Sequence, residues 1–127
     1  MSKRILVVED DFDTRYMLSL ILKGEGYEVI TAADGEGALA VVFDQRPDLI
    51  ITDISMPCLN GIELTRSIRL KKETAALPIV AITAFGETTM NAALAAGASA
   101  CTRKPVRMSE FLPMIKNLIL NGRSQTD

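Results

Sequence analysis

Histidine is absent from the sequence, and this absence excludes several kinds of functional site. Without an imidazole, the chain can form neither a Ser-His-Asp catalytic triad nor a metal site that contains histidine. It also cannot carry a phosphohistidine of its own. Any phosphoryl group that it holds must therefore come from a partner or from a small molecule.

Cysteine is scarce and its spacing is uninformative. The two cysteines, Cys58 and Cys101, are far apart and form no CxxC pair. This argues against a zinc ribbon and against a dense disulfide framework. We therefore expect two reduced thiols, as is usual in a cytoplasmic protein.

Long apolar runs and runs of basic residues are also missing. No stretch approaches the roughly 20 apolar residues of a membrane span, and the chain enters a short strand-like segment at once, without the apolar core and cleavage site of a signal peptide. The net charge is −2, with acidic and basic residues mixed along the chain. We therefore expect a cytoplasmic protein that binds neither membranes nor nucleic acid.

What the sequence does contain is enough apolar material for one compact domain. It has 127 residues, of which 48% are hydrophobic, and single domains most often have roughly 100–150 residues. We predict one domain over residues 1–121. Residues 122–127 are expected to form a disordered tail.

Strand-like and helix-like segments alternate along the whole chain, which predicts an α/β fold: a parallel sheet with helices on both faces. The predicted strands are 4–8, 27–31, 48–52, 79–83 and 100–103, and the predicted helices are 13–23, 35–43, 62–72, 87–96 and 108–120. The first, third and fourth strands are continuously apolar, as in strands buried on both sides, so the second and fifth are expected at the edges. Pro113 falls inside the last helix, where it removes a backbone donor and favours a bend.

Helical spacing predicts which side chains of the first two helices face the core. The expected buried residues are Met17, Leu18, Ile21 and Leu22 in the first helix, and Ala38, Leu39, Val42 and Phe43 in the second. The stretch 44–47, which ends in a proline, is expected to terminate the second helix.

Polar residues follow four of the five predicted strands. Glu9, Asp10 and Asp11 follow the first strand, and the third, fourth and fifth are followed by Asp53, Thr83 and Lys104. Ligands of an open parallel sheet bind beyond the carboxyl ends of its strands, so these side chains are expected to meet at one edge. Each residue alone has an ordinary explanation, such as a solvated turn or a helix cap. Their joint occurrence favours a functional site.

This set of residues suits a phosphoryl group and a divalent cation. Clustered carboxylates repel one another and are stabilised by a cation, and all-oxygen ligation is typical of Mg²⁺. Lys104 would add positive charge and Thr83 a hydroxyl donor, both of which stabilise a phosphoryl group. An aspartate can itself be the nucleophile that forms an acyl phosphate.

With these residues in place, the chain resembles the receiver domains of bacterial two-component signalling, the CheY-like family. The matching segments are Ile5-Leu6-Val7-Val8-Glu9-Asp10-Asp11, Asp53-Ile54-Ser55-Met56-Pro57 with Asn60-Gly61, Ile82-Thr83-Ala84, Gly97-Ala98 and Lys104-Pro105. The resemblance implies a flavodoxin-like sheet of order 2-1-3-4-5, with the first and fifth helices on one face. It also implies a cis bond before Pro105.

The resemblance further implies a role for each site residue. Asp53 would be the phosphoacceptor, with Thr83 and Lys104 binding the phosphoryl group. The residues of the Mg²⁺ site would be Asp10 as the direct ligand, Glu9 acting through water, Asp53, and Ser55 through its carbonyl. The expected partners are a histidine kinase or a histidine phosphotransfer protein as donor, and a downstream protein target. The chain would be a switch, not a dedicated enzyme, and a monomer or weak dimer.

The sequence departs from the family at one position. Cys101 lies three residues before Lys104, where the family usually has tyrosine or phenylalanine. The family's aromatic switch is therefore not implied here, and we interpret Cys101 as a small packing residue. Coupling is expected instead through the loop after Thr83, where Phe85 is the only nearby aromatic residue.

Two rival interpretations remain. A flavodoxin-like FMN carrier shares the strand order, but it would need a Ser/Thr/Gly-rich phosphate loop after the first strand, where this chain is acidic, and aromatic rings for stacking. The second rival is a degenerate receiver that binds partners without phosphorylation. Loss of Asp53, Thr83 or Lys104 would indicate it, and all three are present.

Overall fold

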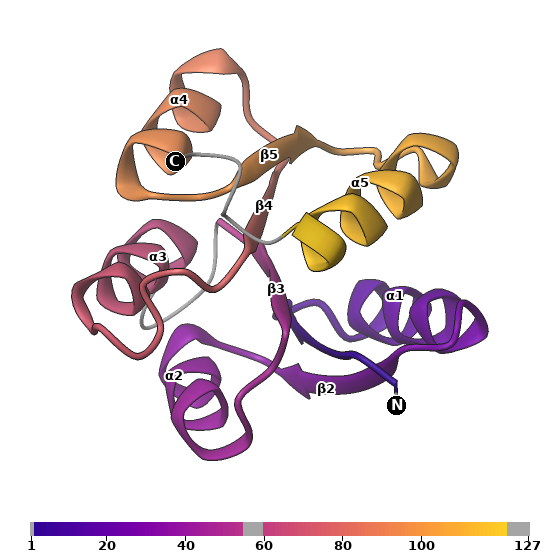
Figure 1. The fold of residues 1–127 in the computed structure, drawn as a ribbon. Coiled ribbons are helices and arrows are strands. Elements are labelled where there is room, and N and C mark those ends of the chain that lie inside the picture. Colours follow the sequence, from indigo (N-terminus) through magenta and orange to yellow (C-terminus); the bar gives the residue numbers. More distant parts are fainter. Residues whose placement is uncertain (1, 55–59, 122–127) are drawn as a thin grey trace.

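The computed structural model describes residues 2–54 and 60–121, and helices and strands alternate strictly over these residues (Figure 1). The elements are β1 (Arg4–Val8), α1 (Phe12–Gly24), β2 (Glu28–Ala32), α2 (Gly35–Gln45), β3 (Leu49–Asp53), α3 (Gly61–Leu70), β4 (Ile79–Thr83), α4 (Glu87–Ala96), β5 (Ala100–Arg103) and α5 (Met108–Asn121). The predicted alternation is confirmed.

The strands form a five-stranded parallel sheet of order β2-β1-β3-β4-β5, as predicted. Helices α1 and α5 cover one face, and α2, α3 and α4 cover the other (Figure 1). The chain therefore has a hydrophobic core on each side of the sheet. All β→α connections leave from one edge, where the carboxyl ends of the strands lie together.

The continuous apolar strands follow from burial on both faces. In β1, Ile5 and Val7 pack beneath α1 and α5, whereas Leu6 and Val8 pack beneath α2 and α3. Every residue of β3 and β4 is buried. The edge strands β2 and β5 contain no fully buried residue, which confirms their predicted positions. Their outer sides need only partial cover, so polar residues are tolerated there.

Side-chain caps fix where several helices begin. The carboxylate of Asp11 accepts a hydrogen bond from the amide of Thr14 at 2.9 Å at the start of α1. Asp34 caps α2 through the amide of Gly37 at 2.8 Å. These caps satisfy amide groups that the first helical turn leaves unpaired. At the C-terminal end of α4, Gly97 takes a φ of 116°, a conformation that favours glycine.

Helix α2 is two residues longer than predicted. It includes Asp44 and ends at Gln45, and the C-cap residue Arg46 has a left-handed φ of 50°. Pro47 restricts the residue before it and removes its own backbone donor, but it does not disturb residues further upstream. Helix α5 includes Pro113 and continues beyond it to Asn121.

Two residues expected in the core are exposed. Met17 is 49% exposed and Phe43 is 37% exposed, so their predicted burial was wrong. Each lies at the margin of its helix's apolar stripe, which is narrower than the pattern suggested. In α1 the adjoining place is taken by Ser19, which is buried because its hydroxyl donates to the carbonyl of Arg15 at 2.8 Å.

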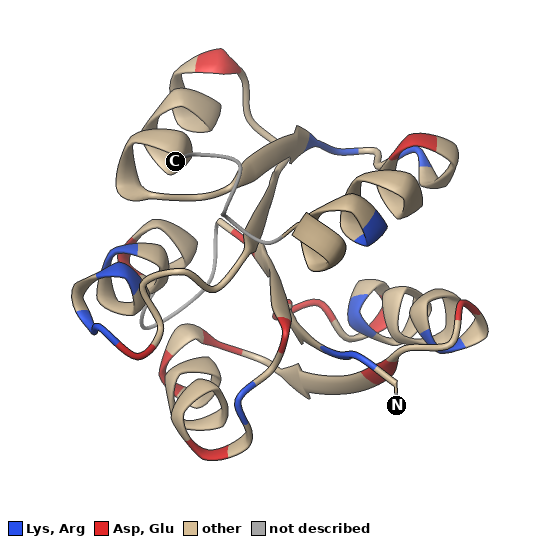
Figure 2. Ribbon diagram, viewed as in Figure 1, with Lys and Arg blue, Asp and Glu red and all other residues tan. Residues whose placement is uncertain are grey.

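Charged residues lie mainly on the helices and at strand ends, with both signs interspersed (Figure 2). Helix α4 carries a single charged residue, Glu87, in its first turn. None of the described helices is long and apolar enough to cross a membrane.

Replacing a buried leucine of α1 should destabilise the domain far more than replacing an exposed one. Leu22 is fully buried in the core beneath α1 and α5, whereas Leu20 on the same helix is 53% exposed. We expect Leu22→Ala to cost about 2–5 kcal/mol of unfolding free energy, and Leu20→Ala less than about 0.5 kcal/mol. Urea denaturation followed by circular dichroism measures both. Equal losses would contradict the packing described here.

Candidate functional site

The carboxyl edge of the sheet brings together four of the predicted site residues. Asp53 and Thr83 are the last residues of β3 and β4, and Glu9 and Lys104 directly follow β1 and β5. The prediction placed Asp53 just after its strand, but it pairs in register with Ile82 of β4. Because backbone pairing with a central strand fixes Asp53, its carboxylate has a well-defined position.

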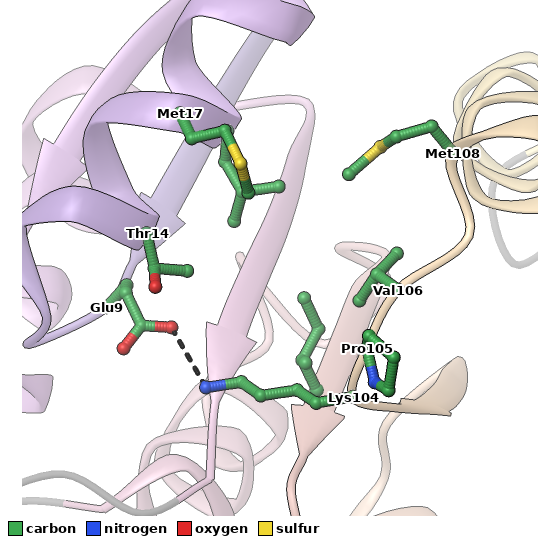
Figure 3. A pocket seen from close by; sticks show the side chains of 9 residues that line it. Glu9, Thr14, Met17, Lys104, Pro105, Val106 and Met108 are labelled. Carbon is green, nitrogen blue, oxygen red and sulfur yellow. Dashed lines mark hydrogen bonds and ion pairs between the residues drawn. The ribbon is translucent and has the colours of Figure 1, made fainter.

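Lys104 connects the acidic residues across the sheet. Its Nζ atom lies 3.5 Å from Oε1 of Glu9 and 3.5 Å from Oδ2 of Asp53. Figure 3 shows the lysine side chain extending from the β5 side toward Glu9. One ammonium group therefore neutralises part of the charge of two carboxylates that are almost completely buried.

Asp10 completes the acidic group. Glu9, Asp10 and Asp53 each offer a carboxylate oxygen, and these oxygens lie within 4.8 Å of one another. Glu9 and Asp53 are buried, whereas Asp10 is exposed and opens the cluster to solvent. Such a set of oxygen donors fits a hard divalent cation such as Mg²⁺. Ser55, the remaining predicted ligand, lies outside the described residues.

Burial and neighbouring charges shift the pKa values of Glu9 and Lys104. The pKa of the Glu9 carboxyl is raised to about 7, mainly by burial and also by the neighbouring Asp53 carboxylate, against the lowering effects of the Asp11 amide and Lys104. Burial alone would lower the pKa of Lys104, but Asp53 and Glu9 together hold it above its usual value. The site thus contains more negative charge than its one ammonium offsets, which favours a bound cation.

Thr83 is buried at the end of β4, and its hydroxyl oxygen accepts a hydrogen bond from the Phe85 amide at 2.9 Å. The hydroxyl hydrogen remains available for a second interaction. The Thr83 carbonyl accepts from the Lys104 amide at 2.8 Å, which ties the ends of β4 and β5 together. The bond between Lys104 and Pro105 is cis, as the resemblance implied.

Asp11 stands apart from the other acidic residues. It is exposed, and its carboxylate is occupied by the amide and hydroxyl of Thr14. These hydrogen bonds lower the pKa of the Asp11 carboxyl. Asp11 is therefore a helix cap, although the sequence grouped it with the acidic cluster.

Cys101 packs beside α4. It is half-buried against the small cluster of Ile54, Ala81, Ala93 and Ala98, and burial raises the pKa of its thiol. A raised pKa keeps the thiol protonated and unreactive. Its interpretation as a packing residue is confirmed.

Two residues that shape the site were not singled out by sequence reasoning. Arg15 of α1 donates a hydrogen bond from Nη1 to the Glu9 carbonyl at 2.6 Å. Gly61, quoted only as part of a motif, begins α3 directly beneath the site. An added Cβ there would clash with the Asp53 carbonyl and would lie 2.9 Å from Cα of Ile54. The sequence reveals neither the side-chain contact of Arg15 nor the close approach of two backbones at Gly61.

A cavity of about 430 Å³ adjoins the acidic cluster on the side of α1 and α5 (Figure 3). Glu9 and Lys104 form its polar end, and Met17, Val106 and Met108 form its apolar part. The site is therefore open to a ligand or to a partner surface from this side.

Comparison with known proteins agrees with the fold. Residues 5–116 match the response regulator receiver domain family. The chain therefore belongs to this family, whose members are signalling modules of two-component systems. It is 36% identical over 117 residues to the DNA-binding response regulator MtrA of Mycolicibacterium paratuberculosis, covering 91% of this chain and 51% of that protein. The chain spans about half the length of the curated relatives that it matches.

Solved structures show the same fold. A putative response regulator from Chloroflexus aurantiacus superimposes with a TM-score of 0.91 at 36% identity, covering 94% of this chain and 99% of that chain. Chemotaxis protein CheY4 of Vibrio cholerae superimposes with a TM-score of 0.86 at 32% identity, covering 92% of this chain and 98% of that chain. The receiver domain of sensor histidine kinase PA1611 from Pseudomonas aeruginosa superimposes with a TM-score of 0.87 at 31% identity, covering 94% of this chain and 98% of that chain. That structure has a magnesium ion coordinated in its active site cleft.

Adding a methyl group at Gly61 should disrupt the site's backbone support. We expect Gly61→Ala to lower the unfolding free energy by about 1–3 kcal/mol, the usual cost of overpacking. Gly24 at the end of α1 is a matched control, because a Cβ there meets nothing within 4 Å. Gly24→Ala should be neutral or stabilising by up to about 1 kcal/mol. Thermal unfolding of both variants measures the difference, and a neutral Gly61→Ala would contradict the close approach.

Proposed function

We propose that this receiver domain accepts a phosphoryl group on Asp53 from a partner's phosphohistidine in a Mg²⁺-dependent reaction. The observation that carries the proposal is the position of the Asp53 carboxylate. It is buried at the end of a central strand, beside one ammonium group and two further carboxylates. This combination holds a nucleophilic oxygen, a cation site and a positive charge within one small volume.

In the proposed reaction, an Asp53 oxygen forms a bond to phosphorus while the bond from phosphorus to the donor imidazole nitrogen breaks. The imidazole leaves with that electron pair, and the product is an aspartyl phosphate. Lys104 already contacts Oδ2 of Asp53, so it holds the carboxylate in place before transfer and pairs with the phosphoryl oxygens afterwards. Thr83 donates its free hydroxyl hydrogen to the same oxygens.

We assign the cation to the acidic group. Asp10 and Asp53 would ligate Mg²⁺ directly, Glu9 would act through water, and the Ser55 carbonyl is proposed as the fourth protein contribution. The ion would offset negative charge on the carboxylates and on the incoming phosphoryl group. The magnesium ion in the PA1611 receiver domain supports this assignment.

The phosphoryl group would act as a switch through charge. It adds negative charge, toward which the side chains of Lys104 and Thr83 can move. The loops after β4 and β5 would move with these residues. We propose that a histidine kinase or a histidine phosphotransfer protein supplies the group and that a downstream protein reads the result, with α4, β5 and α5 as the contact face. The domain, residues 1–121, would act in the cytoplasm as a monomer or weak dimer.

Intact mass spectrometry tests the acceptor directly. After incubation with Mg²⁺ and acetyl phosphate, the wild-type protein should gain the mass of one phosphoryl group. Asp53→Asn should gain none, because an amide is not a nucleophile of this kind, and omission of Mg²⁺ should suppress the adduct. Asp44→Asn is the matched control, because Asp44 is exposed on α2. Absence of an adduct on a folded wild-type protein would favour a degenerate receiver that binds partners constitutively.

Mg²⁺ should also stabilise the folded domain, because only the folded chain brings the carboxylates together. At a concentration about 100 times Kd, the gain should be roughly 2.7 kcal/mol. Asp10→Asn should remove most of this gain, since it deletes the exposed ligand. Thermal unfolding with and without Mg²⁺ measures the effect, and protein treated with EDTA to remove bound metal provides the baseline. An equal Mg²⁺ gain in Asp10→Asn would contradict the ligand assignment.

A further inference from the structure

We propose that Arg15 is a positioning residue for the cation site. Its hydrogen bond to the Glu9 carbonyl fixes the Glu9–Asp10 peptide group, and this peptide group sets the direction in which Asp10 presents its carboxylate. The inference rests on the proposed Mg²⁺ site and adds a residue that contacts neither the cation nor the phosphoryl group.

The first support is that Glu9 is held at each of its polar groups. Its amide donates to the Ala32 carbonyl of β2 at 3.1 Å, and its carboxylate accepts from the Asp11 amide at 3.2 Å and contacts Lys104. Its carbonyl is held by Arg15 at 2.6 Å. That carbonyl and the amide of Asp10 belong to one planar peptide group. Arg15 therefore acts on the unit that leads directly into Asp10.

The second support is that Asp10 depends on its backbone for orientation. Its side chain is exposed, and among the hydrogen bonds of the described residues none involves its carboxylate. Glu9 and Asp53, by contrast, are buried and contact Lys104. Of the three clustered carboxylates, Asp10 is thus the one that side-chain packing leaves unfixed. A restrained peptide group reduces the ordering that a bound cation would have to impose.

The third support is that Arg15 is itself held in place. Its guanidinium carbon lies 5.5 Å from the ring centroid of Phe12, one helical turn earlier. That ring stacks on Tyr16, with centroids 6.0 Å apart and an interplanar angle of 7°. Hydrogen bonds from a charged donor are about twice as strong as neutral ones, and a cation over an aromatic ring is attracted to the negative face of that ring. The arginine is therefore ordered before any cation binds.

Two other roles for Arg15 make different predictions. If it acted only through its positive charge, it would repel Mg²⁺, and its removal would tighten cation binding. If it only stabilised the start of α1, its removal would lower the melting temperature without changing cation affinity. The positioning role alone predicts weaker binding by a folded variant.

The experiment is a Mg²⁺ titration of the metal-free protein, followed by backbone amide chemical shifts, with no phosphoryl donor present. We expect Arg15→Ala to raise the Mg²⁺ Kd about 10-fold or more, the effect typical of residues that support metal ligands. Arg15→Lys keeps a charged donor and should recover part of the affinity. Arg66→Ala removes one positive charge from an exposed position on α3 and should leave Kd unchanged.

The dependence of phosphorylation on Mg²⁺ provides a second readout. The Asp53 phosphorylation rate of Arg15→Ala should approach the wild-type rate at saturating Mg²⁺ and fall only at low Mg²⁺. If Arg15→Ala does not fold, Arg15→Lys and Phe12→Leu test the positioning role instead. Each keeps a positive charge at position 15 but weakens the restraint on the Glu9 carbonyl. Phe12→Leu should raise Kd by a smaller factor than Arg15→Ala.

The outcomes separate this inference from the proposed function. Unchanged or tighter Mg²⁺ binding in folded Arg15 variants, with normal binding by the wild type, overturns the positioning role only. A wild-type protein whose amide shifts do not respond to Mg²⁺ overturns the cation site itself. Weaker binding by Arg66→Ala, equal to that of Arg15→Ala, would show that the loss of affinity is not specific to the arginine at the cation site and would also overturn the inference.

Discussion

The repulsion among three carboxylates at one edge of the sheet is the constraint on which the rest of the site depends. Glu9, Asp10 and Asp53 lie close enough for their oxygens to share one cation, yet the fold supplies a single ammonium, Lys104, at 3.5 Å from two of them. Charges buried in this way persist only when they are paired or bound to a metal. The excess negative charge favours binding of a cation, and in the proposed function this cation is Mg²⁺.

The surrounding structure holds this unfavourable cluster together. Asp53 is fixed by pairing between two central strands, and Gly61 lets α3 approach its backbone. Glu9 is tied to β2 and to α1 through its amide and its carbonyl. The two hydrophobic cores supply the stability that the cluster lacks, because burial of apolar surface is the dominant favourable contribution to folding. A doubly covered sheet thus supports a strained electrostatic site at its edge.

The departure at Cys101 alters how a switch could operate in this chain. A small thiol packed against the alanines of β4 and α4 has no ring to reorient. The Thr83 hydroxyl instead already contacts the amide of Phe85, whose side chain is 55% exposed. Any movement of Thr83 toward a phosphoryl group therefore affects the loop between β4 and α4 directly.

The sequence by itself determined the α/β class, the alternation of elements and which strands lie at the edges, because continuous apolar runs record burial on two faces and helical spacing records burial on one. The full strand order was implied only by the resemblance to receiver domains. The sequence also placed Asp53, Thr83 and Lys104 at one edge, since the carboxyl ends of parallel strands must lie together. Tertiary structure alone decided that Asp11 is a cap and not a ligand, that Met17 and Phe43 are exposed, and that Arg15 reaches the Glu9 carbonyl. Those outcomes depend on the backbone and side-chain geometry where β1 meets α1 and on how much of each helix its neighbours cover, and a residue pattern specifies neither.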